Sequence, residues 1–259
     1  MKIALSQISM IFEDKNSNYI MVEEFVRQAS ENNCDLIIFP EMTCTGFSMN
    51  NKLIGEDDDK TLNYMKSLSC KYNLKICFGQ VIIKDNKYYN NMTIVDHIDE
   101  LLSYDKIHPF TFESNYYSKG NQIKTCKIDN LTLSGFICYD LRFPEIFQRA
   151  SRDSDIIIVI ASWPDKRDDH WLTLLKARAI ENQCYVIGVN RVGKDPSENY
   201  LGHSVVFDGF GNLLTRMSED EENLYIDVNL EDIINSLQGT NFKKDRRDDL
   251  YYQLMKETK

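Results

Sequence analysis

Short apolar runs alternate along the chain with longer segments in which apolar residues recur at three- and four-residue intervals. The short runs are typical of buried strands, and they predict strands at residues 3–5, 36–38, 76–78, 93–95, 131–137, 156–160 and 185–189. The longer segments have the spacing of amphipathic helices, and they predict helices at residues 16–31, 58–71, 144–150 and 169–183. Strands that alternate with helices indicate an α/β fold rather than an all-β or all-α domain.

The composition favours a single domain. The chain has 259 residues, of which 42% are hydrophobic, and this is enough to build a sizeable core. No run rich in Gly, Ser or Pro divides the sequence, so we expect one domain over residues 1–259. The 30 basic and 40 acidic residues give a net charge of −10. This balance argues against a nucleic-acid surface, which needs clustered Lys and Arg.

The distribution of polar residues and cysteines indicates the compartment. No stretch approaches the roughly 18 apolar residues of a membrane span. Ser6, Gln7 and Ser9 interrupt the N-terminal segment, unlike a signal peptide. The seven cysteines are odd in number and scattered along the chain. These observations predict a cytoplasmic protein with reduced thiols and without a membrane partner.

One cysteine stands where a predicted strand meets a predicted helix. Cys138 follows the apolar run at 131–137, and Pro144 and Glu145 are typical of a first helical turn. A sharp strand-to-helix turn lifts a side chain above the sheet and directs the next backbone N–H groups at the group under attack. A helix start also favours the thiolate form of a cysteine. Cys138 is therefore a candidate nucleophile, and the alternative is a cysteine that only fills space in the core.

A carboxylate and an ammonium occupy similar positions elsewhere in the chain. Glu41 follows the strand-like run at 35–39, and Lys106 follows the run at 101–104. In open α/β sheets, functional groups gather at strand ends. Either residue alone is more typical of a solvated surface charge. Glu41, Lys106 and Cys138 together are the three groups that an amide hydrolase needs.

These residues lie in blocks that resemble the nitrilase superfamily of carbon–nitrogen hydrolases. The blocks are FPEM at 39–42, YDKIH at 104–108 and CYDLRFP at 138–144, in the order in which that family has them. The sequence after the nucleophile is similar to the branch called omega-amidases, with ASWP at 161–164, HW at 170–171, ARAIENQ at 177–183 and NRVG at 190–193. The resemblance implies a four-layer α-β-β-α sandwich, and it extends from Lys2 to near the C-terminus.

The resemblance also implies a mechanism without a cofactor. In it, Glu41 acts as the base for Cys138, and Lys106 and the backbone N–H of Tyr139 stabilise the oxyanion. A second glutamate after the lysine block is a family feature, and Glu113 is the only carboxylate of the segment 109–120. We expect Glu113 to orient Lys106 or the attacking water. A solvated loop glutamate is the alternative.

Two further residues bear on the substrate. Arg142 lies four residues after Cys138, and an arginine can bind a carboxylate through two parallel hydrogen bonds. A structural salt bridge is its alternative role. Trp163 follows a buried strand and is expected either to line the pocket or to belong to the core. If Arg142 binds carboxylate, the substrate is the ω-amide of a small dicarboxylic acid. 2-Oxoglutaramate and 2-oxosuccinamate are the examples in the omega-amidase branch.

Other functions remain open on the sequence. Nitrile and N-carbamoyl hydrolysis use the same three residues, and a non-catalytic binding protein is possible on the same scaffold. A papain-like enzyme would need a histidine base, which makes His108 and His170 the candidates. No metal site is expected, because no CxxC pair exists and the four histidines are spread out. The glycines at 209–211 predict a hairpin turn and not a phosphate-binding loop.

Two segments bear on assembly. The predicted helix at 169–183 resembles the helix that relatives use for dimerisation, so a homodimer is expected by analogy. The charged residues at 240–259 resemble the family's C-terminal arm. A disordered polar tail is the alternative reading of this segment.

Overall fold

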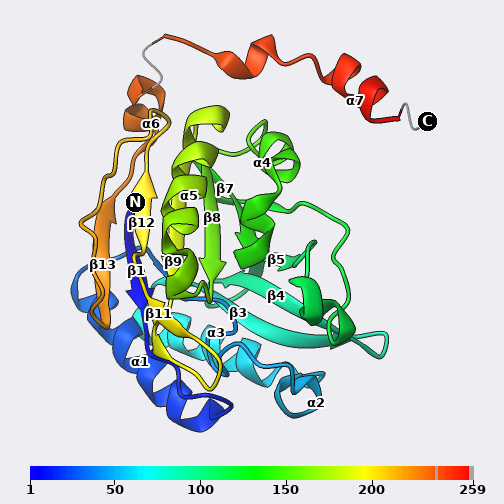
Figure 1. Cartoon of the computed structure of the whole chain (residues 1–259). Helices are drawn as coiled ribbons and strands as arrows, with labels where there is room; N and C mark the ends of the chain where they lie inside the picture. Colours follow the sequence, from blue (N-terminus) through cyan, green and yellow to red (C-terminus); the bar gives the residue numbers. More distant parts are fainter. Residues whose placement is uncertain (237–238, 257–259) are drawn as a thin grey trace.

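The structure is a computed structural model that describes residues 1–236 and 239–256 (Figure 1). Its larger sheet has six strands in the order β13-β1-β2-β3-β4-β5. Strands β1, β2 and β3 run parallel, and the remaining neighbours are antiparallel. The strands of this sheet are β1 (Lys2–Gln7), β2 (Leu36–Ile38), β3 (Lys75–Lys84), β4 (Lys87–Val95), β5 (Glu100–Asp105) and β13 (Glu222–Asp227).

The second sheet has five strands in the order β12-β9-β8-β7-β6. Strands β7, β8 and β9 run parallel, and β6 and β12 add antiparallel edges. A separate antiparallel pair joins β10 to β11. The strands outside the larger sheet are β6 (Thr125–Ile128), β7 (Leu131–Ile137), β8 (Ile156–Ala161), β9 (Tyr185–Asn190), β10 (Val192–Lys194), β11 (Asn199–Leu201) and β12 (Val205–Phe207).

Helices cover the outer faces of both sheets (Figure 1). α1 and α3 pack on the larger sheet, and α4 and α5 pack on the second sheet. The helices are α1 (Lys15–Glu31), α2 (Asn51–Ile54), α3 (Lys60–Tyr72), α4 (Pro144–Ala150), α5 (Asp168–Asn182), α6 (Leu230–Ser236) and α7 (Asp248–Lys256). Four short 3₁₀ helices are η1 (Thr111–Asn115), η2 (Cys138–Arg142), η3 (Asp165–Arg167) and η4 (Phe242–Asp245).

The alternation of side chains along the strands explains why the two sheets pack face to face. In β2, Ile37 belongs to the cluster beneath α1 and α3, whereas Leu36 and Ile38 belong to the cluster between the sheets. Successive side chains of a strand point to opposite faces, so both faces of β2 are buried. In β8 every residue is buried, as expected for a central parallel strand. The predicted four-layer α-β-β-α sandwich is therefore confirmed.

Local sequence signals account for several boundaries. α1 begins after Asp14, whose side chain accepts a hydrogen bond from the Ser17 N–H at 3.1 Å. α4 begins with Pro144 in the first turn, as predicted. β3 and β4 extend beyond the predicted runs to a tight hairpin at Asp85 and Asn86, whose φ values of 51° and 58° are typical of a type I′ turn.

The C-terminal segment starts against the body of the protein and then leaves it (Figure 1). The Gln183 Nε2 donates to the Thr240 carbonyl at 3.1 Å, and the Arg246 Nη2 donates to the Glu181 carbonyl at 2.7 Å. The side chains of α7 are exposed. Of the predicted arm at 240–259, residues 257–259 lie outside the described residues. The single-domain interpretation of residues 1–259 stays a prediction.

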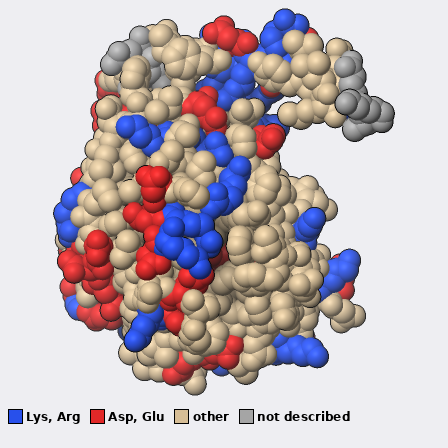
Figure 2. Space-filling view, in the orientation of Figure 1, with Lys and Arg blue, Asp and Glu red and all other residues tan. Residues whose placement is uncertain are grey.

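The surface and the helices bear on possible partners. None of the described helices combines the length and the apolar character that a bilayer crossing requires. Figure 2 shows acidic and basic side chains intermixed on the face that it presents.

Candidate active site

Three strand ends bring the predicted functional residues together. β2 ends at Ile38, three residues before Glu41, and β5 and β7 end immediately before Lys106 and Cys138. After β2 the chain makes a tight turn at Glu41, where the next residue, Met42, has a φ of 50°. The turn lies so close to β3 that a Cβ on Gly79 would stand 2.3 Å from the Met42 nitrogen. Only glycine permits this approach, so Gly79 is needed to place Glu41.

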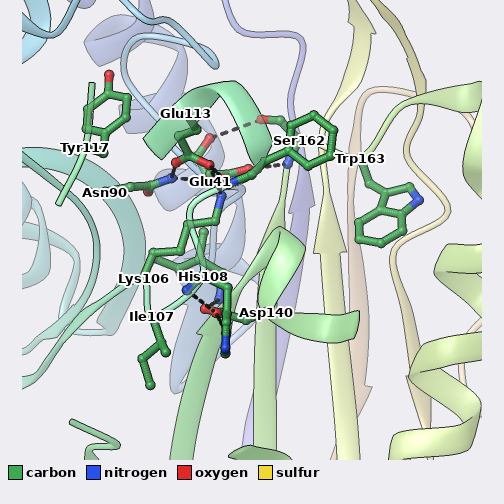
Figure 3. Close-up of polar contacts among 12 residues, drawn as sticks. Glu41, Asn90, Lys106, Ile107, His108, Glu113, Tyr117, Asp140, Ser162 and Trp163 are labelled. Atoms are coloured by element: carbon green, nitrogen blue, oxygen red, sulfur yellow. Dashed lines mark hydrogen bonds and ion pairs between the residues drawn. The ribbon is translucent and has the colours of Figure 1, made fainter. Parts of the chain in front are cut away.

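Lys106 lies between two carboxylates in the interior (Figure 3). Its Nζ is 2.8 Å from Glu41 Oε1 and 2.8 Å from Glu113 Oε2. The three side chains are fully buried. Buried charges are retained where they are paired and hydrogen-bonded. Glu113 is therefore not a solvated loop residue, and it lies in direct contact with the ammonium of Lys106.

Neutral donors hold both carboxylates in place. The Asn90 Nδ2 donates to Glu41 Oε1 at 2.7 Å and to Glu113 Oε1 at 2.9 Å. The Ser162 N–H donates to Glu41 Oε2 at 2.9 Å, and the Phe110 N–H donates to Glu113 Oε2 at 2.7 Å. Each oxygen of the two carboxylates thus accepts at least one hydrogen bond. Such a network fixes the orientation of a buried acid.

The charges of the cluster act on one another. Burial alone would lower the pKa of Lys106, but the carboxylates of Glu113 and Glu41 outweigh it and raise that pKa well above its ordinary value. Burial raises the pKa of Glu113, with Lys106 opposing and Glu41 adding to the rise. Lys106 therefore stays an ammonium at neutral pH. Desolvation and like charge are the ordinary causes of a raised carboxyl pKa.

Cys138 is the first residue of η2 and has a left-handed backbone with a φ of 47°. A non-glycine residue in this region is strained, and such strain is common at functional turns. Cys138 is partly exposed and lines the cavity described below. The structure thus places the thiol on a sharp turn after β7, at the edge of an accessible space.

The expectation that the turn favours thiolate is wrong. Burial and the carboxylate of Glu41 raise the pKa of Cys138 well above its ordinary value of 9.0, and the ammonium of Lys106 only partly offsets them. The element after β7 is a five-residue 3₁₀ helix, which is too short to provide the dipole of a long α-helix. A thiol with so high a pKa is protonated at neutral pH, so Cys138 could serve as a nucleophile only together with a base.

Asp140 joins the lysine segment to the cysteine turn. Its Oδ2 accepts from the Tyr104 hydroxyl at 2.8 Å, and its Oδ1 accepts from the His108 N–H at 2.9 Å. The Nδ1 of His108 is also 2.9 Å from Oδ1, and its ring stacks on Phe143 at 3.7 Å. Figure 3 shows His108 directed at Asp140. His108 is therefore engaged in this link rather than placed as a base.

The second histidine candidate contacts the arginine of the cavity. His170 Nδ1 lies 3.3 Å from the Arg142 Nη2. The charged groups that shift the pKa of Cys138 are Glu41, Lys106 and Glu113. This environment favours a glutamate base and disfavours the papain-like alternative.

A cavity of about 170 Å³ opens beside Cys138. The Arg142 guanidinium lies 4.9 Å from the Trp163 ring centre. No Asp or Glu in the described part of the chain forms an ion pair with Arg142, so the alternative of a structural salt bridge finds no partner there. Trp163 is 3% exposed and both lines the cavity and belongs to the core. The lining residues are Phe47, Phe110, Phe112, Cys138, Tyr139, Arg142, Ser162, Trp163, Pro164, Arg167, Ser197, Glu198 and Tyr200.

Comparisons with known proteins identify the family. The family model described as carbon-nitrogen hydrolase matches residues 2–236. The chain belongs to the carbon-nitrogen hydrolase family. The resemblance that the signature blocks indicated is thereby confirmed.

Relatives of this carbon-nitrogen hydrolase include proteins named as amidases. It is 32% identical over 244 residues to a 2-oxoglutaramate amidase of Bacillus subtilis, which covers 92% of this chain and 94% of that protein. It is 33% identical over 219 residues to the omega-amidase YafV of Yersinia enterocolitica, which covers 82% and 83% of the two chains. Among solved structures, the superfamily member XC1258 from Xanthomonas campestris has a TM-score of 0.89 at 27% identity, covering 95% of this chain and 97% of that one. That protein has an arsenic adduct in its active site.

Sequence reasoning missed three polar residues of this hydrolase site. Asn90, Ser162 and Asp140 are buried and contact either the carboxylate cluster or the lysine segment. Asp140 stands inside the block that identified the cysteine, and Ser162 stands inside ASWP, so both were available as signals. Asn90 lies within β4 and outside every block that resembles the family, so nothing in the sequence marked it. In the part of the chain that the structure describes, no cluster of three or more His, Cys, Asp or Glu side chains is arranged to bind a metal ion.

Proposed function

We propose that this hydrolase releases ammonia from the ω-amide of a small dicarboxylic acid, with 2-oxoglutaramate or 2-oxosuccinamate as the substrates that fit best. The observation that carries the proposal is a thiol, Cys138, in a cavity with Arg142 and beside the buried cluster of Glu41, Lys106 and Glu113. The names of the two amidase relatives support the same reaction. The cavity of about 170 Å³ is smaller than the roughly 300–1,000 Å³ of drug-sized sites, which favours a short substrate.

In the first step, Glu41 takes the proton of the Cys138 thiol while the sulfur attacks the amide carbonyl carbon. The raised pKa of Cys138 makes a base necessary, since little thiolate is present beforehand. The carbonyl oxygen becomes negative, and Lys106 and the backbone N–H of Tyr139 stabilise it. Loss of one such donor typically lowers turnover by about a hundredfold to a thousandfold.

In the second step, the carbon–nitrogen bond breaks. Glu41 returns its proton to the leaving nitrogen, ammonia departs, and a thioester remains on Cys138. Water then attacks the thioester carbonyl and gives a proton to Glu41. The carbon–sulfur bond breaks, the carboxylic acid is released, and the thiol is regenerated with the proton held by Glu41.

Glu113 and Asn90 act on this chemistry through their contacts. Glu113 holds the ammonium of Lys106 together with Glu41, and Asn90 bridges the two carboxylates. With Lys106 held at 2.8 Å by each acid, its position relative to the oxyanion is fixed before the substrate arrives. Electrostatic stabilisation is effective when donors are positioned in advance.

Two other functions compete with this one. Nitrile or N-carbamoyl hydrolysis would use the same nucleophile and base. A simple nitrile gives a cavity arginine no carboxylate to bind, whereas an N-carbamoyl amino acid does, and the assay below separates it from an ω-amide. A non-catalytic binding protein predicts the loss of at least one of Glu41, Lys106 and Cys138, and the sequence has all three.

The deciding experiment measures ammonia release from ω-amides, nitriles and N-carbamoyl compounds. Cys138→Ala is the inactive variant, and Cys70→Ala removes an exposed cysteine as the matched control. We expect turnover of ω-amides by the wild type and the control and none by Cys138→Ala. Turnover of nitriles or carbamoyl compounds alone would contradict the amidase proposal.

We also propose that the protein is a cytoplasmic homodimer that needs no cofactor. Its odd number of cysteines, all unpaired in the structure, supports a reducing compartment. The exposed Ile180 on α5 and the exposed apolar side chains of α7 support contact with a second copy. Light scattering after size exclusion tests the dimer, and a monomer at micromolar concentration would contradict it.

A further inference from the structure

A second arginine borders the cavity and has no role in the chemistry above. Arg167 is the last residue of η3 and lines the cavity together with Arg142. Its guanidinium lies 5.6 Å from the Phe110 ring centre. Its carbonyl accepts a hydrogen bond from the Trp163 Nε1 at 2.7 Å, and its N–H donates to the Pro164 carbonyl at 3.1 Å. These bonds hold the backbone of Arg167 at the cavity wall.

The two cavity arginines differ in their partners from most other arginines of the protein. Arg149 of α4 pairs with Asp153 in the turn that follows, and Arg178 pairs with Glu181 of its own helix. Among the residues that the structure describes, no Asp or Glu forms an ion pair with Arg142 or Arg167, and both guanidiniums lie near aromatic rings. A guanidinium stacked on a ring keeps its N–H edge free for a planar acceptor.

The one carboxylate that lines the cavity is already neutralised. Glu198 Oε1 lies 2.5 Å from the Nζ of Lys166. Because Lys166 offsets the charge of Glu198, the guanidiniums of Arg142 and Arg167 leave the cavity with a net positive charge beside aromatic rings. Such a site favours an anion, and two guanidiniums offer enough donors to bind both oxygens of one carboxylate.

We propose that Arg167 is a substrate-binding residue that shares the substrate carboxylate with Arg142, so that the cavity selects ω-amides that carry a carboxylate. This inference rests on the proposed function. η2 rises about 2 Å per residue, so the backbone of Arg142 lies roughly 8 Å along it from Cys138. A five-carbon substrate chain spans about 5 Å between its end carbons. A long arginine side chain can therefore meet the carboxylate while the amide carbon lies at the thiol.

The test compares substrates with and without the carboxylate. Steady-state ammonia release is measured on 2-oxoglutaramate, glutaramate and the neutral pentanamide, with Arg167→Met, Arg167→Lys and the wild type. Arg216→Met removes an exposed arginine paired with Glu222 and serves as the matched control. Thermal unfolding reports whether each variant folds.

The expected result is a change in KM that depends on the substrate. Arg167→Met raises KM for the two carboxylate substrates by about tenfold to a hundredfold, as for the loss of one charge-assisted hydrogen bond, with little change in kcat. Its kinetics on pentanamide match those of the wild type. Arg167→Lys recovers part of the affinity, and Arg216→Met changes nothing. An unchanged KM for carboxylate substrates in a folded Arg167→Met, or an equal loss on pentanamide, overturns the proposal.

A binding measurement separates this proposal from the proposed function. Calorimetry follows the binding of glutarate to Cys138→Ala, with and without Arg167→Met, and requires no turnover. Weaker binding in the double variant supports the role of Arg167 even if the wild type hydrolyses no ω-amide. Equal binding overturns the role of Arg167 even if ω-amides are hydrolysed.

Discussion

Replacement of Glu113 by glutamine alters a single functional group of the buried cluster and leaves its shape unchanged. Glu113 Oε2 accepts hydrogen bonds from Lys106 and from the Phe110 N–H, and Oε1 accepts one from Asn90. A glutamine has one oxygen and one NH₂ group. In one orientation the NH₂ group of the glutamine faces the Asn90 Nδ2, and in the other it faces Lys106 and the Phe110 N–H. All of these groups are donors. The orientation of lower energy keeps the oxygen toward the charged Lys106 and directs the NH₂ group at the Asn90 Nδ2.

The Asn90 amide cannot turn to accept a hydrogen bond from the new NH₂ group without losing its own hydrogen bond to Glu41. Turning its amide would direct Oδ1 at the new NH₂ group but also at Glu41 Oε1, which now accepts from Nδ2 at 2.7 Å. The disturbance therefore reaches the proposed base. Loss of one hydrogen bond to a charged group costs about 1.5–3 kcal/mol. At the transition state this corresponds to a kcat that is about tenfold to a hundredfold lower.

The assay is steady-state ammonia release from 2-oxoglutaramate. Glu145→Gln is the matched control, because Glu145 is an exposed carboxylate in the first turn of α4. We expect a lower kcat for Glu113→Gln and no change for Glu145→Gln. A folded Glu113→Gln whose kcat stays within about twofold of the wild type, as for an ordinary surface substitution, would refute the reasoning.

Glu113→Gln should also change how the free energy of unfolding depends on pH. Burial raises the pKa of Glu113 above its ordinary value of 4.5. Between the ordinary and the raised value, the folded protein binds more protons than the unfolded chain, so the stabilisation from this group is lost as pH rises through that window. Glutamine does not titrate. In urea unfolding at a series of pH values, the stability of the wild type relative to Glu113→Gln should fall as pH rises above 4.5, and a rise would contradict the burial argument.

Three further predictions follow from the contacts of the site. The pKa of Cys138 is raised well above 9.0, so little thiolate is expected at neutral pH. The wild type and Cys138→Ala should then have the same ultraviolet thiolate absorbance at neutral pH. A thiolate signal in the wild type alone would contradict the need for a base. Asp140→Asn leaves a buried donor, the Tyr104 hydroxyl or the His108 N–H, facing an NH₂ group. We therefore expect the free energy of unfolding in urea to fall by about 1–3 kcal/mol, and an unchanged midpoint would contradict this. In Gly79→Ala, the new Cβ would stand 2.3 Å from the Met42 nitrogen, so we expect a loss of about 1–3 kcal/mol or more from overpacking, together with a lower kcat because Glu41 is displaced. A variant with wild-type stability and kcat would contradict the role of this close approach.

The sequence pattern predicted the central parts of the fold because their signals are local. β2, β7 and α4 have the predicted bounds, since the two strands are compact apolar runs and the helix begins at a proline. The edge strands β6 and β13 were missed. In β6, buried and exposed residues alternate over only four positions, and so short an alternation is weak as a signal. The extension of β3 and β4 depends on the turn at 85–86, whose Asp-Asn pair is a weaker signal than Asn-Gly.

The site was predictable only as far as its residues stand at strand ends. Lys106 and Cys138 follow strands directly, Glu41 stands three residues after β2, and Glu113 came from the family resemblance. The contacts of Asn90 and Ser162 with Glu41 join positions 49 and 121 residues apart, and no local pattern encodes such a pairing. The charge state of Cys138 was predicted wrongly because the sequence indicated the turn but neither the burial nor the adjacent Glu41 carboxylate.

The most direct test of the mechanism is to identify the sulfur that carries the acyl group. The wild type is mixed with 2-oxoglutaramate, quenched in acid, and digested for peptide mass spectrometry. The proposed mechanism predicts an added mass equal to the substrate minus ammonia on the peptide that contains Cys138, and neither adduct nor ammonia release with Cys138→Ala. An adduct on another cysteine, such as the exposed Cys70, or ammonia release by Cys138→Ala would contradict it.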